Sequence, residues 1–141
     1  MIAIIRLRGC IGVNRRIGFA LDLLRLKRVN HCVILKDSKE LKGTLKRIRD
    51  YSTFGEISED VLKRMVEKRG RKVGGARLDS KDVTKMLKLL GEPKKLVEAG
   101  FKPVFRLKPP RKGMKSKKKH FPQGDLGGRG KLINDLLERM I

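Results

Sequence analysis

Residues 2–7, with the sequence IAIIRL, decide the fold of this chain. A short β-branched and apolar run that ends in the turn residues Arg8-Gly9 is typical of a buried strand. Asn14 follows the turn and is placed to cap a helix that ends near Lys27, because an asparagine side chain accepts hydrogen bonds from free N–H groups at a helix start. The chain therefore opens with a strand, a glycine-containing turn and a helix.

Two further strands and a second helix are expected next. Residues 31–35 form another short apolar run, and Ser38 is a good cap for a helix whose apolar residues between 41 and 48 recur at helical spacing. Residues 51–57 are expected to form a third strand. The order β-α-β-α-β predicts a small core over residues 1–58, in which a three-stranded sheet carries two helices on one face.

The rest of the 141 residues is expected to extend this core and to give an α+β protein. Residues 59–106 predict a helical extension packed on the core, in which Ser58 starts one helix and Ser80 caps another. Residues 107–131 predict a basic, extended segment, called the basic segment below, and residues 132–141 predict a C-terminal helix with an apolar face.

Charge is the strongest indication of function. The chain has 37 Lys and Arg against 15 Asp and Glu, a net charge of +22, and residues 1–60 hold only 13 of these cations against 7 acids. Residues 106–119 contain eight Lys and Arg and no acid. Because neutralising phosphates releases counterions, such a charge indicates binding to a nucleic acid.

Three groups of residues are candidates for phosphate contact. The first is the turn from Gly9 to Asn14, with Arg15 and Arg16 in the first turn of the helix, where free N–H groups and the helix dipole favour an anion. The second is a glycine-rich loop over 68–77, in which glycines let cations approach a phosphate chain closely; its cations are Lys68, Arg69, Arg71, Lys72 and Arg77. The third is in the basic segment and comprises Lys108, Arg111, Lys112, Lys115, Lys117, Lys118 and Lys119. For the first two groups the alternative is a solvated turn or surface loop, and for the third it is a disordered tail.

Phe121, beside His120, has two interpretations of equal weight. It stacks on a base or inserts into RNA, or it fixes the basic segment to the protein's own core.

No arrangement for catalysis or metal binding is visible. The two histidines, His31 and His120, and the two cysteines, Cys10 and Cys32, have no metal-ligand spacing, and the acids are mostly scattered. We expect no catalytic residue, metal, cofactor or small-molecule substrate, and two buried cysteines in a reduced cytoplasm. The apolar opening is too short for a signal sequence or membrane span, so no membrane partner is expected.

The sequence resembles the large-subunit ribosomal protein L-thirty family, called L-seven in eukaryotes. The resemblance rests on residues 8–13 (RGCIGV) and 23–26 (LLRL), and more specifically on later motifs. These motifs are KRG at 68–70, PRKGMK at 110–115, HF at 120–121 and INDLLERM at 133–140. They are similar to the long form of archaea and eukaryotes, and the absence of a basic N-terminal arm favours an archaeal source.

The resemblance implies a ferredoxin-like core and a structural role in the large ribosomal subunit, in the cytoplasm. It also implies binding to large-subunit rRNA near the 5S rRNA, with other large-subunit proteins as neighbours. By this similarity the matching contacts with rRNA are Arg8, Arg15, Arg16, Arg69, Arg71, Arg111, Lys112, Lys115 and His120. Lys112 and Gly128 depart from the residues common in the family, which leaves the local loop path open. The alternative is a free-standing nucleic-acid-binding or RNA-chaperone protein; no enzymatic activity is expected.

Overall fold

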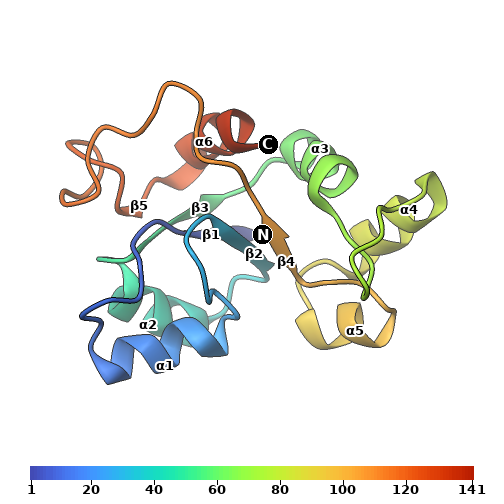
Figure 1. The fold of residues 1–141 in the computed structure, drawn as a ribbon, viewed down its shortest axis with the longest axis horizontal. Coiled ribbons are helices and arrows are strands. Elements are labelled where there is room, and N and C mark those ends of the chain that lie inside the picture. Colours follow the sequence, from blue (N-terminus) through green and yellow to red (C-terminus); the bar gives the residue numbers. More distant parts are fainter.

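Five strands form one sheet in the order β4-β2-β1-β3-β5, with the first apolar run of the chain at its centre (Figure 1). The structure is a computed structural model and describes residues 1–141. The strands are β1 (Ile2–Arg6), β2 (His31–Leu35), β3 (Ser52–Glu56), β4 (Val104–Arg106) and β5 (Gly127–Gly128). β1 is antiparallel to both β2 and β3, β4 is antiparallel to β2, and β5 runs parallel to β3.

The three predicted strands are therefore confirmed, but the sheet has two more. β4 and β5 come from the C-terminal half and pair with the outer sides of β2 and β3. An unpaired strand edge leaves backbone N–H and C=O groups without partners, and short added strands satisfy them.

Six α-helices surround the sheet (Figure 1). They are α1 (Arg15–Leu23), α2 (Lys39–Ile48), α3 (Glu59–Arg69), α4 (Ser80–Leu89), α5 (Pro93–Glu98) and α6 (Ile133–Met140), with the short 3₁₀ helix η1 (Gly130–Leu132) before α6. Alternate residues of β1 separate the faces: Ile4 packs with α1 and α2, whereas Ala3 and Ile5 pack with residues of α3 and α6. The two predicted core helices, α1 and α2, thus share one face, and α3 and α6 lie on the other. α4 packs on α3 and α5, beyond the β4 side of the sheet (Figure 1). None of the helices has both the length and the apolar character needed to span a membrane.

Helix starts show which capping predictions were correct. The Asn14 side chain accepts from the Arg16 backbone N–H at 2.9 Å, and the Ser38 hydroxyl accepts from the Leu41 N–H at 3.1 Å, as predicted. The prediction that Ser80 caps α4 is wrong, because the cap is Asp79. The Asp82 carboxylate in the first turn of α4 accepts a hydrogen bond from the backbone N–H of Asp79 at 3.3 Å, as in a capping box.

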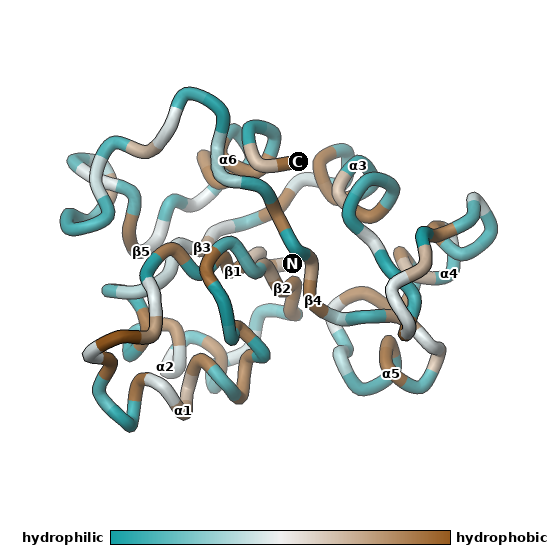
Figure 2. The backbone as a smooth tube through the Cα atoms, viewed as in Figure 1, coloured by the Kyte–Doolittle hydropathy of each residue, from teal (hydrophilic) through white to brown (hydrophobic).

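The basic segment runs through a series of turns and bends between β4 and η1. Figure 2 shows it as mostly hydrophilic, in contrast to the apolar strands β1 and β2. Its one acid, Asp125, is buried, pairs with Arg129, and accepts from the Ser116 N–H at 3.0 Å. Arg129 Nε also donates to the Thr53 hydroxyl on β3 at 3.2 Å. These polar contacts hold a segment that has little apolar surface to bury.

The two cysteines differ. Cys32 on β2 is fully buried, and burial raises the pKa of its thiol to about 12. Cys10 is exposed, so the prediction that both are buried is wrong for Cys10. The reason is its place in the turn between β1 and α1, where the apolar neighbours Ile11 and Val13 do not enter the core.

Candidate RNA interface

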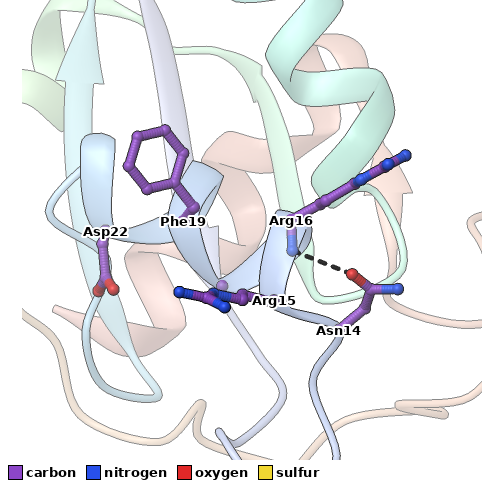
Figure 3. A pocket seen from close by; sticks show the side chains of 6 residues that line it. Asn14, Arg15, Arg16, Phe19 and Asp22 are labelled. Carbon is purple, nitrogen blue, oxygen red and sulfur yellow. Dashed lines mark hydrogen bonds between the residues drawn. The ribbon is translucent and has the colours of Figure 1, made fainter.

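A basic turn, residues 8–16, connects β1 to α1 and lies at the protein surface (Figure 3). Its cations Arg15 and Arg16 are exposed in the first turn of α1. In Figure 3 Arg15 extends toward Asp22, and Arg16 extends in the opposite direction. Two cations at a helix start oppose the helix dipole, and an anion bound there relieves that conflict.

The basic turn is held from inside by Arg6, a residue that the sequence analysis did not single out. Arg6 is 4% exposed at the end of β1. Its guanidinium donates to the carbonyls of Leu26 at 2.7 Å, Arg8 at 2.9 Å and Gly9 at 3.0 Å. Because charged donors make stronger hydrogen bonds than neutral ones, these contacts fix the path of the turn. An arginine inside an apolar strand was the only sequence signal for this role.

Arg8 is held in a fixed position on the surface. Its guanidinium lies over the Tyr51 ring, 5.0 Å from the ring centre, and Nη1 donates to the Asp50 carbonyl at 3.3 Å. Lys117 and Lys118 of the basic segment line the same hollow as Arg8. The structure thus brings the first and third groups of predicted residues together, although about a hundred residues separate them in the chain.

The other predicted cations of the basic segment are exposed along its turns. These are Lys108, Arg111, Lys112, Lys115 and Lys119. His120 connects this segment to the start of β3, because its Nε2 lies 3.0 Å from the Asp50 carboxylate. The Phe121 ring is half-buried and lies 5.2 Å from the Arg129 guanidinium carbon. It contacts the protein itself, and it also lines a hollow that is open to solvent.

The glycine-rich loop 68–77 is next to β4, at the opposite edge of the sheet from β5. Lys72 is already engaged there. Its ammonium lies 2.6 Å from the Asp82 carboxylate and 3.2 Å from that of Asp79, and hydrogen bonds to Asp82 and then Asp79 raise its pKa. Lys72 therefore holds the loop on the start of α4, whereas Lys68 and Arg77 are exposed.

Four cations gather beside that loop around a cavity of about 270 Å³. They are Arg69, Arg71, Lys102 and Arg106, and no carboxylate lines the cavity. Arg69 Nη2 donates to the carbonyl of Ile141 at 2.7 Å, while its Nε is buried without a partner. Lys102 was missed because it follows an apolar stretch, and only the pairing of β4 with β2 places it here. Like charges crowded together favour an anionic ligand.

The same excess of positive charge acts on His31. Burial, followed by Arg106, Arg28 and Arg6, lowers the pKa of the His31 imidazole below its usual 6.5. No group of three or more His, Cys, Asp or Glu side chains lies close enough together to hold a metal ion. The surface instead presents cations on exposed turns. Some of them, such as Arg8, are held in place by neighbouring groups, and others, such as Lys117 and Lys118, have long exposed side chains.

The fold and these surfaces define a basic α+β protein with a structural role. Such a protein offers the charge and the shape of its surface to a partner. The model for the family described as ribosomal protein L30p/L7e matches residues 2–51. A protein named large ribosomal subunit protein uL30 from Methanosphaera stadtmanae is 41% identical to the chain and covers 100% of both chains. Its namesakes from Methanococcus maripaludis and Archaeoglobus fulgidus are 41% and 38% identical, over 99% of this chain and 98% and 99% of theirs.

The chain therefore belongs to the L30p/L7e family of ribosomal proteins, which are structural proteins and not enzymes. The resemblance noted from the motifs is confirmed, and the match to archaeal relatives extends through the basic segment to the C-terminal helix.

Proposed function

We propose that this protein is a structural constituent of the large ribosomal subunit and binds folded large-subunit rRNA in the neighbourhood of the 5S rRNA. Relatives that match the chain over nearly their whole length carry the name of a large-subunit protein. The observation that carries the RNA contact is the meeting of Arg8 with Lys117 and Lys118 around one hollow, beside the exposed Arg15 and Arg16. Neighbouring large-subunit proteins are further partners.

The two sides of this interface act differently. The basic turn is rigid, because Arg6 and the Asn14 cap fix its backbone, and a rigid turn matches one arrangement of phosphates. The lysines of the basic segment have long, exposed side chains that adapt to many arrangements. The turn therefore supplies discrimination between RNAs, and the lysines supply affinity.

The cation cavity beside the loop 68–77 is a second contact with RNA. Arg69 and Arg71, which the sequence indicated, are joined there by Lys102 and Arg106. The cation cavity lies beside the edge strand β4, whereas the hollow that contains Arg8 lies at the end of the central strand β1, so RNA can hold the protein at two separate places.

Filter binding across a salt series tests the RNA contact. One variant replaces Arg15 and Arg16 with Ala, a second replaces Lys117 and Lys118 with Ala, and a control replaces the exposed Lys81 and Lys85 of α4 with Ala. All three lose two positive charges. The lysine variant is expected to flatten the log–log salt slope by about 0.7–0.9 per lost phosphate contact. The arginine variant is expected to reduce the preference for large-subunit rRNA over an unrelated RNA of equal length. Equal losses for all three would mean that net charge alone governs binding.

Membership of the particle and its site are tested separately. Large subunits washed in high salt and sedimented are expected to retain the protein, whereas a free-standing nucleic-acid-binding protein or RNA chaperone dissociates. Ultraviolet crosslinking in the washed subunit is expected to join the basic turn or the basic segment to rRNA close to the 5S rRNA. Crosslinks only to distant rRNA would overturn the proposed location.

A further inference from the structure

A hollow of about 360 Å³ lies where α2 meets the loop formed by residues 120–128. We call it the α2 hollow. It is distinct from the basic turn and from the cation cavity beside the loop 68–77, since it shares no lining residue with either. Its volume is at the lower end of the range of about 300–1,000 Å³ that is usual for sites of small ligands.

The floor of the α2 hollow is apolar and aromatic. Leu45 of α2, Phe54 of β3 and Phe121 all line it, so two of the chain's five phenylalanines meet here. Both rings are only half-buried, although apolar side chains of this size are usually fully covered in a core. The floor therefore offers aromatic surface to a ligand.

Gly128 leaves the Phe54 ring uncovered. A Cβ atom built at Gly128 would lie 3.4 Å from Cε2 of Phe54, which is ordinary contact distance, so any larger side chain would cover that ring. Gly128 itself is exposed on β5. The Phe121 ring has the Arg129 guanidinium 5.2 Å from its centre, which holds the ring in place beside the hollow.

Cations form the rim of the α2 hollow. Lys42, Lys46 and Arg49 recur at helical spacing along α2 and its C-terminal end, and they line the hollow with exposed side chains, whereas Leu45 is buried. Lys42 lies 3.1 Å from the Asp37 carboxylate and Arg49 lies 3.7 Å from that of Asp50, whereas Lys46 has no carboxylate within 4.0 Å. A cationic rim over an aromatic floor matches the two parts of a nucleotide, because the phosphate is anionic and the base has two π faces.

We propose that the α2 hollow receives one unstacked base of an RNA strand, with the base against Phe54 and Phe121 and its phosphate near Lys46. This inference rests on the proposed binding to RNA and adds a base contact to the phosphate contacts described above. Specific RNA recognition commonly uses bases turned out of single-stranded loops and bulges and stacked on aromatic side chains.

Filling the hollow tests the proposal. In Gly128→Val the new side chain covers Phe54, and affinity for large-subunit rRNA is expected to fall roughly 5- to 100-fold, the usual loss for one stacked base. The salt slope should stay unchanged, because a base contact releases no counterions. Lys46→Ala should instead flatten the slope. Gly43→Ala on α2, where a Cβ meets nothing within 4 Å, is the matched control and should bind as the wild type does.

Crosslinking gives a readout that does not depend on how a variant folds. The wild-type protein bound to rRNA that contains 4-thiouridine is expected to carry a nucleotide adduct on the peptide with Phe54 or Phe121. If binding persists and depends on Arg15 and Arg16, but no such adduct forms and Gly128→Val binds normally, the base contact is wrong while the proposed function stands. A second outcome would also overturn the proposal. If the peptides with Phe54 and Phe121 carry no RNA, and an amine-reactive crosslinker joins Lys46 to a neighbouring protein in the subunit, the α2 hollow is a protein docking site.

Discussion

Residues 2–56 and the basic segment reach a defined path in opposite ways. In the first region, apolar residues at strand and helix spacing bury themselves against one another, so that Ile4 and Leu21 are both 0% exposed. In the basic segment most side chains are exposed, and the backbone is held by polar contacts around Asp125 and Arg129. The first region is stabilised by burial of apolar surface, and the second by a few buried polar groups.

This difference shows how an RNA-binding surface can be kept basic and still follow a fixed course. Apolar residues in the basic segment would compete with lysines for space on the surface. A single buried acid avoids that conflict, because Asp125 satisfies Arg129 and the Ser116 N–H at once. Amino-acid substitutions in the two regions should therefore have different effects on stability.

The largest expected effect is in the first region. Ile4→Ala removes a fully buried side chain from the central strand and should lower the free energy of unfolding by about 2–5 kcal/mol. Both faces of the sheet depend on β1, so the whole chain should lose stability together. Denaturant unfolding monitored by circular dichroism measures this. A loss below about 1 kcal/mol would mean that the sheet is not the common core of the two regions.

The junction of the two regions is expected to be the next most sensitive. In Gly55→Ala the new Cβ would overlap the Gly130 carbonyl oxygen and lie 3.0 Å from the Ile133 Cβ, and overpacking of this kind costs about 1–3 kcal/mol. Faster hydrogen exchange should then appear in η1 and α6. Gly43→Ala is the control: it lies in α2 with open space around it and should stabilise the protein by about 0.5–1 kcal/mol. If α6 is equally protected from hydrogen exchange in Gly55→Ala and Gly43→Ala, the close packing of Gly55 does not hold η1 and α6 in place.

Asp125→Asn should open the basic segment while leaving most of the fold intact. Removing one partner of a buried pair typically costs about 3–5 kcal/mol, but here the cost is limited to the free energy that docks this segment, because Arg129 can move out to solvent. We expect faster cleavage by trypsin within 115–119 and a smaller drop in global stability than for Gly55→Ala. Glu138→Gln, which removes an exposed pair with Arg64, should change neither. Unchanged cleavage of Asp125→Asn would show that the pair does not hold the segment.

The smallest effect concerns pH. The pKa of His31 is lowered by burial and by Arg106, Arg28 and Arg6, so the folded protein keeps the imidazole neutral where the unfolded chain takes up a proton. Stability should therefore fall as the pH drops below about 6.5. Because β2 pairs His31 with Arg106 of β4, this titration reports on the link between the regions. Thermal unfolding of wild type and His31→Gln between pH 7.5 and pH 5 should show a smaller fall for the variant; equal falls would exclude His31 as the source.

The sequence predicted the first region well, because its signals are local. The short apolar runs at 2–7 and 31–35 stand next to turn residues and are typical of strands, and Phe54 and Ile57 indicated the third strand within 51–57. β5 could not be predicted, since Gly127 and Gly128 carry no side-chain pattern and become a strand only by pairing with β3. The cap of α4 was misassigned because Asp79 and Ser80 are adjacent and both cap well.

For the candidate site, the sequence predicted which cationic side chains are exposed better than it predicted which of them lie close together. Arg15 and Arg16 are exposed as the turn before them indicated. The engagement of Lys72 by two carboxylates was not foreseeable, because it requires the loop to fold onto α4. Lys102 carried no signal for the same reason: its neighbours in space come from distant parts of the chain. The roles of the predicted RNA-contacting residues remain predictions for the binding experiments above.

The contrast between the two cysteines gives this protein a built-in means of labelling. Cys10 lies exposed in the hollow that contains Arg8 and Lys117, whereas the Cys32 thiol is fully buried, with its pKa raised to about 12. A maleimide dye or spin label added to the folded, unmodified protein should therefore attach at one position only, because thiolate and access are both needed for reaction. That position lies within the basic turn, so the native sequence itself allows the approach of a nucleic acid to be followed spectroscopically without engineered substitutions.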